Sequence, residues 1–235
     1  LDNVNIPAAS KRGIVVMNTP GGNTVTTAEH ALSMLMSLAR NIPQADHSMK
    51  QGKWEKKKFS GTEIYNKTLG VIGLGKIGSI VADRAAGLGM NVIAYDPFLS
   101  EEQAKQMGIK LESLDTVLAQ SHFITLHVPL TDDTRGLINA ANIAKMKDGV
   151  RIVNCSRGPV VNEDDLADAI ESGKVAGAAL DVYAKEPPGL TRLISLDRVI
   201  CTPHLGASTQ EAQDNVAIAV ATQIRDYLLY GTIRN

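Results

Sequence analysis

The chain has 235 residues, 44% of them hydrophobic, and its formal net charge is -1 at pH 7. This length can bury a full hydrophobic core in one or two domains. The small charge argues against a surface that holds nucleic acid or membrane by bulk electrostatics, and no apolar run reaches membrane-spanning length. Two cysteines, Cys155 and Cys201, are too few for a disulfide framework. We therefore expect a globular protein of the cytoplasm, without a nucleic-acid or membrane partner.

The chain begins at Leu1 without an initiator Met, and residues 1–4 look like part of an ordered turn, so we interpret it as a fragment. Apolar residues at helical spacing then predict a helix over 24–40, followed by a second helix from about 43 to 50. A projecting helix pair needs something to cover its apolar face. From the residues alone, two interpretations are equally open: the pair forms an arm that binds a second copy of the chain, or it packs on its own domain.

From Leu69 onward, short β-branched runs alternate with helical patterns. The alternation predicts right-handed βαβ units and a doubly wound parallel sheet, whose ligands bind outside the carboxyl ends of the strands. The last helix, over about 208–230, stops at Gly231. The predicted strands cover 69–73, 91–95, 109–111, 123–128, 151–154, 175–180 and 198–201, and the helices among them cover 76–88, 100–107, 113–119, 139–146 and 163–171.

A glycine-rich turn, Gly73-Leu74-Gly75-Lys76-Ile77-Gly78, lies directly between the first predicted strand of the sheet and a helix. The first glycine suits a tight turn, the second lets backbone approach a pyrophosphate, and the third lets helix and strand pack closely. Asp96 follows the next strand, where an acid binds the ribose of a dinucleotide. The context favours a dinucleotide site over the alternative, which is ordinary turn glycines in an α/β domain.

Three polar side chains follow later strands of the predicted sheet: Arg157, Glu186 and His204. Hydride exchange between a nicotinamide and a 2-hydroxy or 2-oxo acid needs a proton donor or acceptor and a cation for the carboxylate. His204, bounded by a proline, suits the acid–base role, with Glu186 orienting it. Arg157 suits bidentate binding of the carboxylate. His30, His47, His122 and His127 lack this setting.

Each of these side chains also has a plain structural interpretation. Taken alone, His204 is more often structural than catalytic, Arg157 caps a helix or pairs with a surface acid, and Glu186 belongs to a turn. The functional interpretation depends on all three falling at successive strand ends. The basic run Lys53, Lys56, Lys57 and Lys58 is either a solvated loop face or a source of charge for a phosphate across a dimer.

Together these segments resemble the D-isomer-specific 2-hydroxyacid dehydrogenases over essentially the whole chain. Further segments are most similar to the branch that interconverts 3-phosphoglycerate and 3-phosphohydroxypyruvate, the first step of phosphorylated serine biosynthesis. The family segments are Gly73 to Gly78, Asn154-Cys155-Ser156-Arg157-Gly158, Ala178-Ala179-Leu180-Asp181-Val182, Glu186-Pro187 and Pro203-His204-Leu205-Gly206-Ala207-Ser208-Thr209. The narrower match lies in Asn18 to Thr24, in Gly52-Lys53-Trp54-Glu55 and in the histidine segment.

The resemblance implies a role for each matching residue. Arg157, Glu186 and His204 correspond to the family's catalytic set, and Asn23, Arg157 and His204 to its substrate contacts. The implied contacts to NAD are Gly73, Gly75, Lys76, Ile77, Gly78, Asp96, Val128, Cys155, Ser156, Arg157, Asp181, His204, Gly206 and Ala207. No metal site is predicted. The helices over 24–52 resemble the family's dimer arm, which favours a homodimer, with a tetramer possible at full length.

The implied architecture is a Rossmann domain over 21–208, with remnants of a split substrate domain at 1–20 and 209–235. Because the rest of the substrate domain normally supplies half of the cleft wall, we expect the chain to bind NAD but to turn over substrate poorly. Two other functions stay open. One is another dehydrogenase of the family, acting on glyoxylate, hydroxypyruvate or D-lactate. The second, of a different class, is an NAD-sensing corepressor that binds peptides.

Overall fold

The computed structural model describes residues 4–233, so most of the turn expected at residues 1–4 falls outside the described residues. The chain divides into two compact units. One unit is residues 27–206, and the other joins residues 1–26 to residues 207–235. The assignment of the chain's two ends to a split substrate domain stays a prediction.

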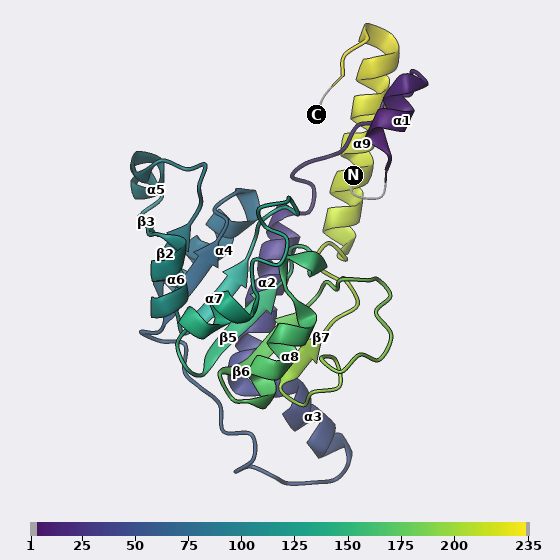
Figure 1. Cartoon of the computed structure of the whole chain (residues 1–235). Helices are drawn as coiled ribbons and strands as arrows, with labels where there is room; N and C mark the ends of the chain where they lie inside the picture. Colours follow the sequence, from purple (N-terminus) through teal and green to yellow (C-terminus); the bar gives the residue numbers. More distant parts are fainter. Residues whose placement is uncertain (1–3, 234–235) are drawn as a thin grey trace. The chain divides into compact units, whose positions relative to one another are not determined.

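The larger unit is built on one parallel sheet of seven strands in the order β3-β2-β1-β4-β5-β6-β7 (Figure 1). The strand order reverses between β1 and β4, which are adjacent in the sheet although two strands separate them in sequence. The strands are β1 Thr68–Ile72, β2 Asn91–Tyr95, β3 Lys110–Leu111, β4 Phe123–Leu126, β5 Val150–Asn154, β6 Val175–Leu180 and β7 Val199–Cys201. The predicted doubly wound parallel sheet is confirmed.

Helices cover both faces of this sheet, because side chains alternate between the faces along each strand. Leu69 and Val71 of β1 pack with helices α2 and α4 in one core cluster. Ile72 packs in the other cluster, with α6, α7 and α8. The helices of this unit are α2 Thr24–Arg40, α3 Ile42–Lys50, α4 Lys76–Gly87, α5 Glu101–Gln106, α6 Leu114–Gln120, α7 Ala140–Lys145 and α8 Glu163–Glu171, with a short 3₁₀ turn at Gly158–Val160.

Short polar residues begin several of these helices, because a side-chain oxygen satisfies an amide that has no partner within the helix. The Ser113 side chain accepts from the Thr116 amide at the start of α6. The Asn162 side chain accepts from two amides at the start of α8, whose first turn is acidic. By contrast, Gly75 begins α4 without any side-chain cap, which leaves amides of its first turn available to a ligand.

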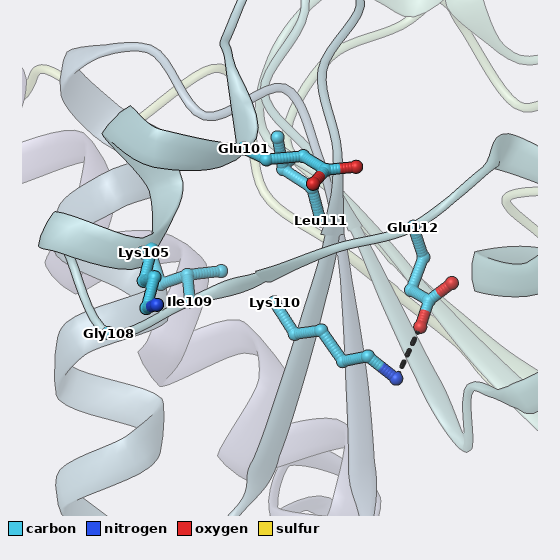
Figure 2. A pocket seen from close by; sticks show the side chains of 7 residues that line it. All are labelled: Glu101, Lys105, Gly108, Ile109, Lys110, Leu111 and Glu112. Atoms are coloured by element: carbon cyan, nitrogen blue, oxygen red, sulfur yellow. Dashed lines mark ion pairs between the residues drawn. The ribbon is translucent and has the colours of Figure 1, made fainter.

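The free edge of the sheet at β3 is short and charged. Figure 2 shows Lys110 of this strand reaching Glu112, with Nζ and carboxylate oxygen 2.6 Å apart. A two-residue edge with charged side chains gives another strand little to pair with. The shallow hollow beside it is lined by Glu101, Lys105, Gly108, Ile109, Lys110, Leu111 and Glu112 (Figure 2).

The smaller unit contains helix α1 Ile6–Lys11 and helix α9 Gln210–Tyr230. The Gln223 side chain donates to the carbonyl of Asn18 over 3.0 Å, which ties the N-terminal segment to α9. A Cβ on Gly22 would lie 2.6 Å from a methyl carbon of Val216, so glycine permits a close approach there. In the described part of the chain, no helix is long and apolar enough to cross a membrane.

The predicted elements differ from the structure mainly at their ends. Gly73 was predicted to end the first strand of the sheet, but its φ of 95° takes the chain out of β1 after Ile72. The strand predicted over 123–128 ends at Leu126. The last helix begins at Gln210 rather than 208, because the Thr209 side chain caps it by accepting from the Ala212 amide. Helix α1 and the 3₁₀ turn were not predicted.

Candidate active site

The glycine-rich turn after β1 is tightly packed at two of its glycines and open at the third. A Cβ on Gly73 would lie 2.6 Å from the carbonyl oxygen of His127, which follows the neighbouring strand β4. A Cβ on Gly78 would overlap the carbonyl oxygen of Gly73. At Gly75, a Cβ would meet no protein atom within 4 Å. The turn therefore leaves free space at the position where backbone has to approach a phosphate.

Asp96 joins the end of β2 to this turn. Its Oδ2 accepts a hydrogen bond from the Leu74 amide over 2.8 Å, and its Oδ1 accepts from the Phe98 amide over 2.9 Å. The carboxylate thus lies beside the glycine turn, and the start of α4 follows directly in the chain. In dinucleotide-binding folds, the acid after the second strand binds the ribose. The N-terminus of the helix that follows the first strand binds the pyrophosphate. The residues present fit a dinucleotide.

His127 lies behind the turn, with its amide donating to the carbonyl of Ile72 over 2.8 Å. Its ring Nε2 is hydrogen-bonded to the Thr125 hydroxyl over 2.9 Å. Burial lowers the pKa of His127 to about 4. The ring is therefore neutral at neutral pH and serves as packing behind the glycine turn.

The loop after β5 is shaped by Asn154, a residue that the sequence analysis placed in the segment without giving it a role. Its Oδ1 accepts from the Ser156 amide over 3.0 Å and from the Ser156 hydroxyl over 2.8 Å. Its Nδ2 donates to the carbonyl of Arg157 over 3.0 Å. The exposed Arg157 side chain donates from Nη1 to the Ser156 carbonyl over 2.7 Å. These bonds give the arginine loop a fixed backbone.

Glycine at position 158 brings this loop against the loop that follows β6. A Cβ on Gly158 would overlap the carbonyl group of Tyr183, so only glycine fits at this contact. The Tyr183 amide in turn donates to Glu186 Oε1 over 3.1 Å. Arg157 and Glu186 are thus carried by two loops whose backbones are in contact.

Glu186 and His204 form a hydrogen-bonded pair across neighbouring strand ends. The His204 Nδ1 lies 2.7 Å from Glu186 Oε2, and because a carboxylate only accepts, Nδ1 carries the proton. Both side chains are exposed. The backbone of His204 has a φ of 56°, in the left-handed region that non-glycine residues rarely adopt. The hydrogen bond on which the predicted orientation of His204 depends is present, and the role itself stays a prediction.

Asp181, at the end of β6, is buried and anchors the loop that contains His204. Its Oδ1 accepts from the Leu205 amide over 2.7 Å, and its Oδ2 accepts from the Gly206 amide over 2.8 Å. Burial opposes the charged form of Asp181, but hydrogen bonds from His30, Thr202 and these amides outweigh it and hold the pKa below its usual range. Asp181 is therefore charged at neutral pH.

His30 and Cys155 both lie beside Asp181. His30 was grouped with the histidines that lack the strand-end setting of His204, but its Nε2 lies 3.1 Å from Asp181 Oδ1. Burial, together with the charge of Asp181, raises the pKa of the Cys155 thiol, so the thiol stays protonated at neutral pH. Ligand atoms of His30, Cys155 and Asp181 lie within 4.8 Å of one another. The oxygens of Asp181 already accept several hydrogen bonds, so His30 and Asp181 belong to a hydrogen-bond network beside Cys155.

The structure brings together most of the predicted site residues of the larger unit. The three glycines, Lys76, Ile77 and Asp96 surround the turn after β1, and the Val128 side chain would be 3.0 Å from a Cβ on Gly73. Asn23 and Ala207 belong to the smaller unit, and their roles stay predictions. The functional assignments of the other residues are likewise predictions. Hydrogen bonds of four further residues shape the site, although no local pattern in the sequence marks them: His30, Asn154, Tyr183 and Thr202.

Comparison with known proteins gives a consistent result. The family described as "D-isomer specific 2-hydroxyacid dehydrogenase, NAD binding domain" matches residues 32–206. The D-3-phosphoglycerate dehydrogenase of Synechocystis sp. is 58% identical over 97% of this chain, which spans 41% of that protein. A glyoxylate reductase structure from Paecilomyes thermophila is 36% identical, with a TM-score of 0.91, over 100% of this chain and 71% of that chain. The D-lactate dehydrogenase of Aquifex aeolicus, complexed with NAD and lactic acid, is 31% identical, with a TM-score of 0.86, over 97% and 73% of the two chains.

The open space at Gly75 leads to a test of the cofactor site. Gly75→Ala adds a methyl group that meets no protein atom, so we expect an unchanged melting temperature. The methyl group takes the place of the pyrophosphate, and we expect NAD affinity to fall about 10- to 100-fold. A fluorescence titration with NAD measures the affinity. Gly87→Ala, at the far end of α4, is the control, because an added Cβ there also meets no atom within 4 Å and the residue has no positive φ. Normal NAD affinity in Gly75→Ala would contradict the assignment.

The neutral, half-buried His127 leads to a test by pH. Between pH 6.5 and about 4 the unfolded chain takes up a proton at this position and the folded chain does not, so stability falls as pH falls. The contribution is up to about 1.4 kcal/mol per pH unit, and His127→Gln should remove it. Urea unfolding of both proteins between pH 4 and 8 measures the difference. His47→Gln, at an exposed ring, is the control, and an equal pH dependence in the two variants would contradict the prediction.

Proposed function

Because this chain belongs to the D-isomer-specific 2-hydroxyacid dehydrogenase family, we propose that it forms the cofactor-binding half of an enzyme that interconverts 3-phosphoglycerate and 3-phosphohydroxypyruvate. The observation that carries the proposal is the Glu186–His204 pair, held at 2.7 Å beside the cofactor edge of the sheet. The 58% identity to a D-3-phosphoglycerate dehydrogenase supports the choice of substrate. The chain spans about two fifths of that relative, so the activity is proposed for the full-length protein.

His204 supplies the proton in this proposal. Its Nδ1–H is directed to Glu186, which leaves Nε2 as the ring nitrogen that faces substrate. In the direction of reduction, Nε2–H donates a proton to the carbonyl oxygen of the 2-oxo acid. In the direction of oxidation, the neutral ring accepts the proton of the hydroxyl group. Glu186 keeps the ring in the required tautomer and stabilises its protonated form.

Arg157 binds the substrate carboxylate in this proposal. Its guanidinium is exposed and carries a planar fork of donors that matches a carboxylate. Its loop is fixed by Asn154 and packs through Gly158 on the loop of Glu186, so the cation and the acid–base pair keep a constant spacing. A fixed spacing holds the reacting carbon in one place relative to the proton donor.

The domain binds NAD, which supplies hydride exchange at its nicotinamide. We assign the pyrophosphate to the turn of Gly73, Gly75 and Gly78 and the adenosine ribose to Asp96. Lys76, Ile77 and Val128 lie around the same turn. We assign the nicotinamide to the side of Cys155, Ser156, Asp181 and Gly206, with Ala207 after them in the chain.

Other substrates of the family remain candidates because the same Arg, Glu and His serve any 2-hydroxy acid. The structural similarity to a glyoxylate reductase and to a D-lactate dehydrogenase supports keeping them in the test. A corepressor that binds peptides and senses NAD is the candidate of another class. Turnover of oxo acids by the full-length protein separates the three. For the chain alone, poor turnover stays our prediction.

We further propose that the helices over 24–52 form the arm of a homodimer. The apolar face of α2 packs on the sheet of its own unit, so the exposed apolar surface lies on α3 and just after it. Ile42 and Met49 of α3 are 52% and 53% exposed, and Trp54, which follows the helices, is 79% exposed. Apolar side chains at this density along an arm are typical of a surface that a second copy covers. Cytoplasmic serine biosynthesis is the setting we propose, since both cysteines are free.

Substitution of His204 tests the proposed function. We expect His204→Asn in the full-length protein to lower kcat roughly 10²- to 10⁴-fold on 3-phosphohydroxypyruvate, because the proton donor is lost. The Kd for NAD should be unchanged. The assay follows NADH absorbance over a panel of 2-oxo acids that includes glyoxylate, hydroxypyruvate and pyruvate. His122→Asn, at the amino end of β4, is the control, and full activity of His204→Asn would refute the acid–base assignment.

The Asp96 carboxylate leads to a test of cofactor choice. A 2′-phosphate at about 4 Å from a carboxylate costs up to ~4 kcal/mol per charge at an effective dielectric of about 20. We therefore expect NADP to bind about 10²- to 10³-fold more weakly than NAD, after allowance for screening. Parallel titrations with the two cofactors measure the ratio, and Asp96→Asn should reduce it. Equal affinity of the unsubstituted protein for both would show that Asp96 does not select the cofactor.

A further inference from the structure

The backbone that presents His204 depends on one buried carboxylate. A non-glycine residue at a φ of 56° persists only where its surroundings hold it. The Leu205 and Gly206 amides, which directly follow His204, donate to Asp181 over 2.7 and 2.8 Å. The His204 amide donates to the Thr202 carbonyl over 3.0 Å. The position of the imidazole therefore depends on where Asp181 lies.

Asp181 in turn needs partners of its own, because its side chain is only 1% exposed and a buried carboxylate without donors is strongly unfavourable. Two side chains donate to its Oδ1 beside the Leu205 amide. One is the Thr202 hydroxyl, and the other is His30 Nε2 at 3.1 Å. Of the donors to Asp181 that the structure describes, His30 alone can carry a positive charge.

The geometry also fixes which nitrogen of His30 holds a proton. The Thr202 hydroxyl donates to Asp181, so its oxygen is free to accept from His30 Nε2, which lies 3.1 Å away. The Nε2–H is thus shared between the Asp181 carboxylate and the Thr202 oxygen. His30 belongs to α2, whereas Asp181 and Thr202 follow β6 and β7. The contact joins the predicted arm helix to the loop of His204.

We propose that His30 is a positioning residue for the reaction, acting through Asp181 on the backbone that presents His204. The inference rests on the proposed function. His30 donates to Asp181 and Thr202, and its effect reaches the reaction through the placement of the His204 ring. A proton donor displaced by a fraction of an ångström lowers turnover at saturating substrate and cofactor.

Two substitutions at position 30 separate hydrogen bonding from packing. His30→Met fills a similar volume without a donor, and we expect kcat to fall about 10- to 100-fold in the full-length enzyme. His30→Gln keeps an N–H donor at nearly the same reach, and we expect kcat within about threefold of the unsubstituted enzyme. Steady-state rates at saturating NAD and hydroxy acid measure both. His122→Met is the matched control, since it loses a hydrogen bond at the amino edge of the sheet, from the Thr68 amide.

Thr202→Val provides a second test that does not depend on the folding of a position-30 variant. Valine keeps the shape of threonine but removes the hydroxyl, which donates to the same Asp181 oxygen as His30. We expect kcat to fall about threefold or more. Normal kcat in His30→Met would overturn the proposal. So would normal kcat in Thr202→Val, or His30→Gln falling as far as His30→Met. Rescue of kcat by His30→Gln would support it.

The activity of His204→Asn distinguishes a failure of this inference from a failure of the proposed function. If His204→Asn retains full activity, the acid–base assignment fails. If His204→Asn is inactive while His30→Met turns over normally, only the role of His30 fails. The melting temperatures of His30→Met and His122→Met are measured alongside kcat. If kcat falls in His30→Met but not in His122→Met, the loss comes from positioning rather than from lower stability.

Discussion

The parallel direction of all seven strands is the constraint on which the site depends. In a parallel sheet every strand ends at the same edge, so loops far apart in sequence meet there. Gly73 follows β1, Asp96 follows β2, and Arg157 follows β5. Glu186 and His204 lie after β6 and β7, and their side chains meet at 2.7 Å. An antiparallel arrangement would send half of these loops to the opposite edge and separate the Glu186–His204 pair from the glycine turn.

The site also requires backbone segments to lie in close contact, and glycine residues allow this at several positions. Gly73 and Gly78 let the turn after β1 close against β4 and against itself. Gly158 lets the arginine loop lie on the loop of Glu186. At these places a methyl group would overlap backbone, which can relieve the overlap only by moving a loop. Gly75 is different, because the space in front of it contains no protein atom and fits a ligand.

The sequence predicted the sheet and the placement of the candidate residues at its strand ends because both depend on local pattern. The helix over 163–171 and the strand over 175–180 have the predicted bounds, since apolar periodicity and turn residues mark them. Helix α1 buries none of its residues and leaves no apolar period to detect. The partnership of His30 with Asp181 spans 151 positions, and the pattern of α2 shows which face is buried but not which strand end that face meets.

The burial of Asp181 explains why a helix that precedes the whole sheet in sequence takes part in the site. A carboxylate can be withdrawn from water only if donors surround it, and the two amides after His204 supply part of that need. The remaining donors must come from elements that pack on the ends of β6 and β7. Thr202 comes from the same loop as His204, whereas His30 comes from α2. The loop that contains His204 and the helix α2 therefore both depend on one buried carboxylate, because each supplies donors to Asp181.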